Sequence, residues 1–131
     1  MKKALIALTL AFLSTSTIAA WTGVTKSGVF GVTVYADYDT IQKSGSTSKV
    51  WILNDFKAVQ EIDGVKYLSI KTQEEFNCDD RQTRSLTHFA YSGNMGSGQV
   101  VNSYDNTDKW RPVKPGSLGE IQSKVACGIN K

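Results

Sequence analysis

The chain has few residues whose types and spacing could perform catalysis. Its one histidine, His88, lies in RSLTHFAYS, a segment that mixes apolar and polar residues as a strand with one wet face does. A Ser-His-Asp or Cys-His nucleophile system would have to be assembled around this imidazole. The chain contains no G-x-S-x-G motif, the local signature of a hydrolase serine. We therefore expect His88 to be an ordinary strand histidine.

Two pairs of acidic residues flank the first cysteine. Glu74 and Glu75 precede Cys78, and Asp79 and Asp80 follow it. Paired carboxylates perform acid–base chemistry when they face each other across a cleft with separated pKa values. Adjacent acids in a loop are more often solvated, and the spacing here does not match the calcium loop of an EF-hand. We predict neither a catalytic pair nor a metal site at these residues.

The Gly-rich segment GNMGSG at residues 93–98 shares only its glycines with a phosphate-binding loop. A P-loop needs a Lys followed by Ser or Thr and then a helix, and neither follows here. We predict a hairpin tip at this segment. Since no other motif in the chain suggests a cofactor or a nucleophile, we predict that the protein has no cofactor and is not an enzyme.

The segment KWRPVKP at residues 109–115 is the best candidate for a binding surface. Three cations surround a tryptophan in a stretch that two prolines keep extended. Trp and Arg are enriched at binding hot spots, because each combines a large contact area with a directed polar group. The alternative is that the tryptophan packs under a helix and the cations are solvated. With two arginines of the preceding strand, the candidate protein-binding patch comprises Lys109, Trp110, Arg111, Lys114, Arg81 and Arg84.

The N-terminus predicts export. Lys2 and Lys3 precede an apolar run at residues 4–13, and small and polar residues follow up to Ala20. A bilayer span takes about 20 apolar residues, so this run is too short and reads as a cleavable secretory signal at residues 1–19. Cleavage after Ala20 is the alternative. No Cys follows the apolar run, so we do not expect the lipid-modified N-terminus of a bacterial lipoprotein.

Removal of the signal leaves residues 20–131, which is the length of a single domain, and no transmembrane span. The signal carries two of the 15 Lys and Arg residues and none of the 12 Asp and Glu residues, so the mature charge is 13 − 12 = +1. A nucleic-acid-binding domain shows a larger excess of cations, so we expect no nucleic-acid partner.

Both cysteines, Cys78 and Cys127, lie in the mature part of the chain. An even pair in an exported protein predicts a disulfide bond. A thiol nucleophile or half of a metal site are the alternatives, and each would need partner residues that the sequence does not supply.

Alternation of β-branched and aromatic residues predicts a series of strands. In the first of them Phe30, Val32 and Val34 share one face, and KVWILNDF is apolar enough to be a central strand covered on both faces. Turn signals at 44–48 and at Asp63-Gly64 separate the runs, which indicates an antiparallel sheet. The predicted strands are 30–38, 49–56, 65–72, 81–92 and 99–104.

The C-terminal segment predicts a short amphipathic helix. Ser117 and Glu120 fit a capping box, and Gly128 fits the residue that follows a helix. The spacing of Leu118, Ile121 and Val125 gives one apolar face. The predicted fold class is therefore α+β, an antiparallel β-sheet with this short helix packed on it.

Cys127 projects away from the apolar face of that helix. Either the helix unwinds by Ala126, or the disulfide holds the helix from its outer side.

Several motifs recur in a fixed order: VYADYDTI (34–41), VWILNDF (50–56), YLSIKTQEEFNC (67–78), R-x-x-R (81–84), YSGNMGSGQVV (91–101), W-R-P-V-x-P-G-S (110–117) and V-x-C (125–127). Together with both cysteines, this set resembles the surface-adhesin protein E family of Gram-negative bacteria over residues 34–127. The resemblance implies an antiparallel sheet with a C-terminal helix fixed by a disulfide. The matching positions are mainly those expected to hold the fold: Tyr35, Trp51, Cys78, Tyr91, Trp110, Pro115 and Cys127.

The resemblance also implies a function. A member of the family is an outer-membrane lipoprotein adhesin that binds host extracellular-matrix and serum proteins and can dimerise. Its adhesive segments are not motifs of the whole family, so the resemblance implies no binding residue in this chain. We therefore expect an exported, non-enzymatic, adhesin-like binding protein of the periplasm, the cell surface or the medium, with a protein partner and the capacity to form a homodimer. The alternative is a soluble periplasmic accessory or inhibitor protein that binds an envelope partner.

Overall fold

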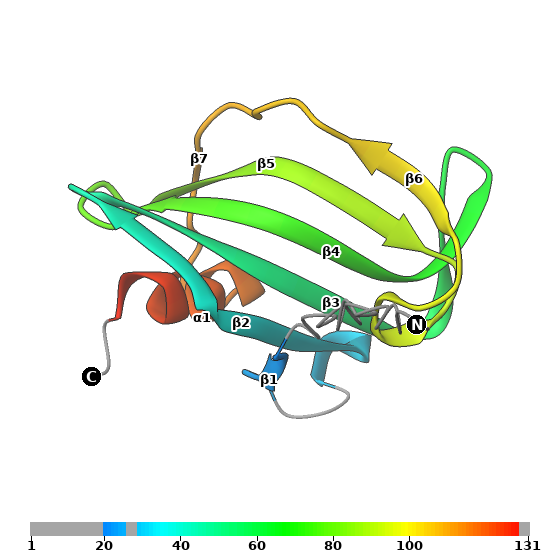
Figure 1. The fold of residues 1–131 in the computed structure, drawn as a ribbon. Coiled ribbons are helices and arrows are strands. Elements are labelled where there is room, and N and C mark those ends of the chain that lie inside the picture. Colours follow the sequence, from blue (N-terminus) through cyan, green and yellow to red (C-terminus); the bar gives the residue numbers. More distant parts are fainter. Residues whose placement is uncertain (1–19, 26–28, 129–131) are drawn as a thin grey trace, which may run out of the picture.

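Successive strands pair with their sequence neighbours to form one antiparallel sheet in the order β1-β2-β3-β4-β5-β6, and β7 also pairs with β5 (Figure 1). The computed structural model describes residues 20–25 and 29–128, so the predicted signal at 1–19 lies outside the described residues. One helix, α1, packs on the sheet, which confirms the predicted fold class. The elements are β1 (Thr22–Gly23), β2 (Val32–Ser44), β3 (Thr47–Ile62), β4 (Val65–Asn77), β5 (Gln82–Tyr91), β6 (Val100–Tyr104), β7 (Arg111–Pro112) and α1 (Leu118–Cys127).

The first long strand begins later than predicted. Phe30 lies in a 3-10 turn at Val29–Gly31, with φ at 60° and 65% of its surface exposed, so its predicted place beside Val32 and Val34 is wrong. The strand also continues beyond Tyr38 through an irregularity between Asp37 and Gln42. Polar side chains stabilise this irregularity, because the hydroxyl of Thr40 accepts a hydrogen bond from the Trp51 amide at 3.0 Å.

The two central strands are longer than predicted and form a tight hairpin. β3 has 16 residues and β4 has 13, and they turn at Asp63-Gly64 as predicted. Alternate residues of β2 and β3 point to one face of the sheet, where they meet α1. Burial of each such aliphatic side chain stabilises the fold by about 1.5–3 kcal/mol. The core cluster on this face is Val32, Val34, Ala36, Val50, Ile52, Phe76 and Ala126.

The helix begins and ends at the predicted residues. Ser117 is the N-cap, and its hydroxyl accepts a hydrogen bond from the Glu120 amide at 3.3 Å. The reciprocal half of the capping box is not formed, because the Ser117 amide donates to the Lys114 carbonyl at 3.3 Å and the Glu120 carboxylate pairs with Lys124 at 3.4 Å. Gly128 follows the helix with φ at 70°, a left-handed conformation that glycine adopts without strain.

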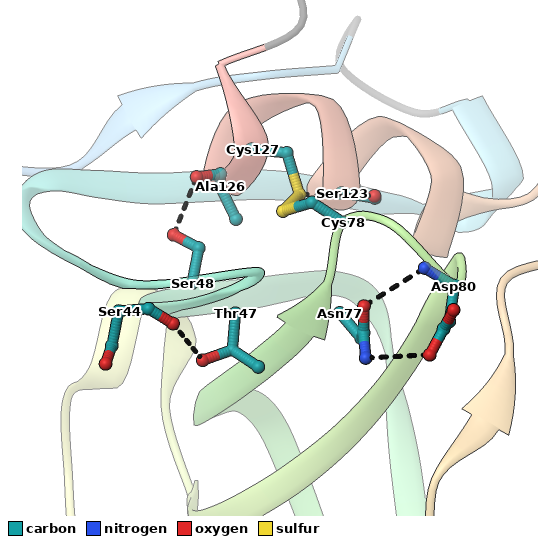
Figure 2. Close-up of a disulfide and its surroundings, with 9 residues drawn as sticks. All are labelled: Ser44, Thr47, Ser48, Asn77, Cys78, Asp80, Ser123, Ala126 and Cys127. Carbon is teal, nitrogen blue, oxygen red and sulfur yellow. Dashed lines mark hydrogen bonds between the residues drawn. A yellow bond between two sulfur atoms is a disulfide. The ribbon is translucent and has the colours of Figure 1, made fainter.

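The predicted disulfide joins Cys78, in the turn after β4, to Cys127 (Figure 2). The helix remains wound through Cys127, which excludes the alternative that it unwinds by Ala126. Ala126 is fully buried, and its carbonyl accepts a hydrogen bond from the Ser48 hydroxyl at 2.7 Å. The disulfide and this hydrogen bond therefore hold the last turn of the helix to β3 and β4 from two neighbouring residues.

The Gly-rich segment 93–98 connects the antiparallel neighbours β5 and β6, which confirms the predicted hairpin tip, and it also folds back on the sheet. Its 3-10 turn at Asn94–Gly96 is held by Asp55, whose Oδ1 accepts hydrogen bonds from Asn94 Nδ2 at 3.0 Å and from the Met95 amide at 2.8 Å. The buried Ser69 hydroxyl donates to the Gly93 carbonyl and accepts from the Gly96 amide. Polar side chains of β3 and β4 thus bind this turn to the face opposite α1.

Candidate functional site

The structure divides the predicted binding patch between the two faces of the sheet. β7 pairs with β5 so that Thr83 lies opposite Arg111, and successive residues of a strand point to opposite faces. Arg111 therefore points to the helix face, where its guanidinium lies 3.8 Å from the Glu74 carboxylate. Trp110 lies instead with Arg84 on the face opposite α1.

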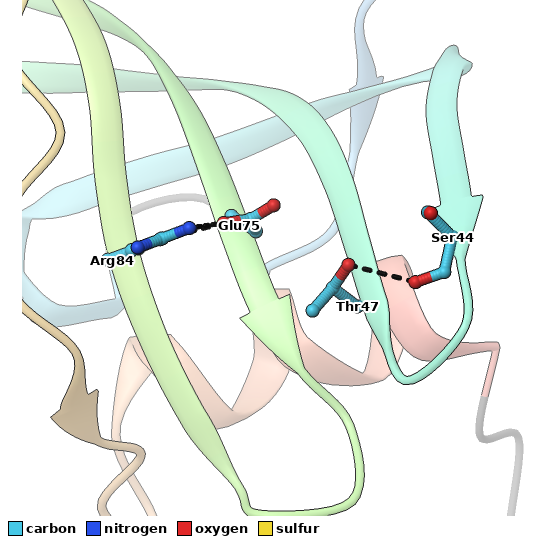
Figure 3. Close-up of polar contacts among 4 residues, drawn as sticks. All are labelled: Ser44, Thr47, Glu75 and Arg84. Atoms are coloured by element: carbon cyan, nitrogen blue, oxygen red, sulfur yellow. Dashed lines mark hydrogen bonds and ion pairs between the residues drawn. The ribbon is translucent and has the colours of Figure 1, made fainter.

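Arg84 contacts Trp110, with which the sequence grouped it, and also Glu75, which the sequence did not place near it. Its guanidinium lies 4.2 Å from the centroid of the Trp110 ring, and it forms a 2.6 Å ion pair with Glu75. In Figure 3, Arg84 and Glu75 meet on adjacent strands, and α1 passes behind those strands. The Trp110 ring therefore covers a cation instead of packing under the helix, which was the alternative considered for it.

The other cations of the predicted patch are exposed. Lys109 and Lys114 are solvent-exposed, and Arg81 is exposed in the turn before β5 with φ at 52°. The carbonyl of Arg81 accepts a hydrogen bond from the Val113 amide at 2.9 Å, which fixes the 110–114 segment to the end of β5. These three residues thus border the sheet without contributing to the Arg84–Trp110 contact.

A second group of aromatic residues lies on the same face as Arg84, around Lys71 of β4. The Lys71 ammonium is 4.8 Å from the ring centroid of Trp51 and 5.9 Å from that of Trp21. The rings of Trp51 and Phe89 are stacked with centroids 6.4 Å apart. All four side chains are partly exposed. Sequence reasoning missed this group as a site, because it treated Trp51 as a residue that holds the fold.

Cross-strand register explains why these residues gather. Leu53 lies opposite Lys71, and Lys71 lies opposite Phe89, so residues from β3, β4 and β5 form a row on one face. Trp51 stands in the adjacent row, two residues before Leu53 on the same face. All three tryptophans of the chain therefore contact a cation on this side of the sheet. We call it the aromatic face, and it comprises Trp21, Trp51, Lys71, Arg84, Phe89 and Trp110.

The residues first considered for catalysis are held in structural contacts. His88 lies 3.1 Å from the Asn102 side-chain oxygen and stacks on Tyr104. The buried Glu74 carboxylate accepts hydrogen bonds from the hydroxyls of Thr83 at 3.0 Å and Ser85 at 2.5 Å. Hydrogen bonds to both carboxylate oxygens compensate the burial of this charge. The geometry therefore brings no histidine together with these acids.

The acids that follow Cys78 are exposed. Asp80 Oδ2 accepts a hydrogen bond from Asn77 Nδ2 at 3.2 Å in the turn between β4 and β5. Over the ranges 20–25 and 29–128, no group of three or more His, Cys, Asp or Glu side chains is arranged to hold a metal ion. Within the same ranges, no helix has the length and apolarity needed to cross a membrane.

A groove of about 640 Å³ lies on the other side of the molecule, between β2 and α1. Ile41, Ile121 and Val125 supply its apolar part, and Lys43 and Lys124 lie among its other lining residues. Tyr38 also lines it, so the groove offers aliphatic contacts, one aromatic ring and cations.

The fold and this face define a class of protein: a small, disulfide-linked sheet-and-helix domain whose distinctive surface is suited to contact with another macromolecule. Comparison with known proteins makes the class specific. The chain belongs to the surface-adhesin protein E family, whose model matches residues 21–128. This membership confirms the resemblance of the sequence motifs, and a family of surface adhesins implies an exported or cell-surface protein.

Solved structures of Haemophilus influenzae protein E share the fold. Crystal form II of that protein has a TM-score of 0.60 and 10% sequence identity, covering 84% of this chain and 97% of that chain. A selenomethionine form has a TM-score of 0.59 and 13% identity, covering 84% and 93%. Protein E from a non-typeable strain has a TM-score of 0.56 and 12% identity, covering 87% and 79%. A search of curated protein sequences found no significant match.

Proposed function

We propose that the mature chain is an exported, non-enzymatic adhesin that engages host extracellular-matrix or serum proteins through the aromatic face. Membership of a surface-adhesin family supports the function. We locate the binding site on this face because all three tryptophans contact cations there.

The chemistry of this face favours protein recognition. Partly exposed indole rings supply large, rigid contact areas that lose little conformational entropy on binding. Lys71 and Arg84 add charge, and the aromatic contacts restrict their movement before a partner arrives. A pre-organised surface of this composition resembles the hot spots of protein interfaces.

Binding of the mature protein, residues 20–131, to immobilised matrix and serum proteins tests this function. We expect saturable binding to at least one of them, reduced at least about tenfold by Trp51→Ala, which is the loss expected for a hot-spot aromatic residue. Tyr104→Ala is the matched control, because Tyr104 is an exposed aromatic residue on the helix face that stacks on His88. Equal losses in both variants would remove the aromatic face from the proposal.

Location in the cell separates adhesion from the alternative of a periplasmic accessory or inhibitor protein. Treatment of intact cells with protease should degrade the mature domain if it is displayed, and secreted protein should be found in the medium. Protection in intact cells, with release in the periplasmic fraction, would contradict the adhesin function and direct the search to envelope partners.

A further inference from the structure

Lys71 has an unusual environment for a lysine side chain. It is partly buried on β4, between the rings of Trp51 at 4.8 Å and Trp21 at 5.9 Å. Among the described residues, the ion pairs involve Arg84, Arg111 and Lys124, and none of them includes Lys71. The indole faces attract the ammonium, yet they leave its three N–H donors without a negative charge to bind.

The acids on the same face are committed to other partners. Glu75 pairs with Arg84, and Asp55 accepts two hydrogen bonds from the 93–98 turn. The buried Asp37, which lies opposite Trp51, accepts a hydrogen bond from the Asp39 amide at 3.1 Å. None of these carboxylates forms an ion pair with the Lys71 ammonium, so a negative group from outside would make the direct ion pair that the face itself does not supply.

We propose that the site around Lys71 binds a carboxylate side chain of an acidic, extended peptide segment, with aliphatic or aromatic neighbours of that acid contacting Trp21 and Trp51. This inference rests on the proposed adhesive function and names the chemistry that the partner presents. The partner's Asp or Glu binds the Lys71 ammonium, where the aromatic rings reduce competition from water.

The arrangement of cations favours a peptide over a sulfated polysaccharide. A polysulfated chain carries charge along its whole length and binds best to a track of several free cations. On this face Arg84 is occupied by Glu75, and Lys49 lies opposite the same carboxylate. Lys71, by contrast, lies between two indole rings, and a cation in that setting fits a single acid with apolar neighbours.

Selection from a random peptide library displayed on phage tests this proposal with the mature protein. We expect peptides enriched on the parent to contain an Asp or Glu next to an aliphatic or aromatic residue. A synthetic copy of such a peptide should bind Lys71→Met about tenfold more weakly, a loss typical for removal of one charged partner. Methionine keeps the apolar stem of the lysine, and near-ultraviolet circular dichroism establishes that the variant is folded.

Lys66→Met is the matched control, because Lys66 is an exposed lysine on the same strand. Its affinity for the peptide should stay within about twofold of the parent, a difference well below 1 kcal/mol. Replacement of the peptide acid by its amide should weaken binding to the parent but not to Lys71→Met.

Three results would overturn the proposal: no enriched peptide, enriched peptides without an acid, or equal binding to the parent and Lys71→Met. Binding of heparin that depends on Lys71 would also overturn it in favour of a sulfated glycan. If matrix proteins bind and depend on Trp51 while Lys71→Met has no effect, the acidic-segment proposal fails and the adhesive function stands. If no matrix or serum protein binds, the function fails whatever the peptides show.

Discussion

Arg84 is the residue whose contacts link the predicted binding patch to the sheet. Its side chain is 29% exposed, whereas the side chain of its partner Glu75 is only 7% exposed. This ion pair is therefore more buried than a surface salt bridge and less buried than one in the protein interior. Removal of the arginine would leave a nearly buried carboxylate without its cation, which is more costly than the loss of a surface pair.

We predict that Arg84→Met lowers the free energy of unfolding by about 2 kcal/mol, because it removes charged hydrogen bonds and the contact with Trp110. Urea unfolding at neutral pH measures the change. Glu75→Met in the same chain should restore part of the loss, since no unpaired charge then remains. The exposed Lys109→Met is the control and should change stability by less than about 0.5 kcal/mol. Similar losses of stability in Arg84→Met and in the control Lys109→Met would contradict this role of Arg84.

Tyr67 makes stability depend on alkaline pH. Burial raises the pKa of its phenol, because desolvation disfavours the charged form, and its ring packs edge-to-face with Phe56 at 5.8 Å. The stability that the buried, neutral Tyr67 phenol contributes is fully present below the pKa of about 10 that it has in the unfolded chain, and it is lost as pH rises above that value. We predict that unfolding free energy falls less steeply between about pH 9 and 11 in Tyr67→Phe than in Tyr104→Phe. The same pH dependence of the unfolding free energy in both variants would contradict this role of Tyr67.

The sequence predicted some residue contacts and missed others for an identifiable reason. Arg84 was grouped with Trp110 as a cation that would add charge to the 109–115 segment if its strand lay nearby, and the structure places the two side chains in contact. The Lys71 site was missed, because it depends on the register of three strands. A shift of one residue in any of them would point its side chains to the other face.

At the scale of elements, the disulfide and Ser48 attach the helix to the sheet. The cysteines are 49 residues apart in sequence, and the chain-entropy model assigns such a loop about 4 kcal/mol of stabilisation. We predict that a variant carrying Cys78→Ala and Cys127→Ala loses roughly this amount in urea unfolding. Reduction of the disulfide in the parent should lower the free energy of unfolding by the same amount. A loss below about 1 kcal/mol would show that the disulfide constrains the unfolded chain little.

The 93–98 turn depends on a side chain from another strand. Asp55 accepts hydrogen bonds from Asn94 and from the amide of Met95, whose φ is 54°. We predict that Asp55→Ala costs about 1–2 kcal/mol and accelerates hydrogen exchange of the Met95 amide far more than that of the β3 amides. Equal acceleration throughout the protein would indicate global destabilisation, and no acceleration at Met95 would remove Asp55 from this role.

Elements specified by local signals were predicted well. The Ser117 cap, the Gly128 stop and the Asp63-Gly64 turn each use residues adjacent in sequence, and all three are present in the structure. The folding of the 93–98 turn onto the sheet was not predicted, because its partners Asp55 and Ser69 lie between 24 and 40 residues away in sequence. The irregularity of β2 after Asp37 likewise depends on contacts across the strand pair.

At the scale of the whole molecule, α1 covers one face of the sheet and leaves the aromatic face partly exposed. The covered face holds the aliphatic core, which explains the stability of the domain without using the tryptophans. The opposite face carries aromatic rings and cations that lie outside this core cluster, although Arg84 among them also holds the buried Glu75 carboxylate. This separation of structure and recognition between two faces is the basis of the proposed adhesive function.

Nuclear magnetic resonance of the three indole N–H groups tests this account most directly. The mature protein, labelled with nitrogen-15, would be titrated with the matrix or serum protein fragment that binds it. We predict that the Trp21 and Trp51 signals shift or broaden first, with smaller changes at Trp110 and little change at the amides of α1. Changes confined to α1 and the neighbouring groove, with unaltered Trp21 and Trp51 signals, would contradict the assignment of binding to the aromatic face.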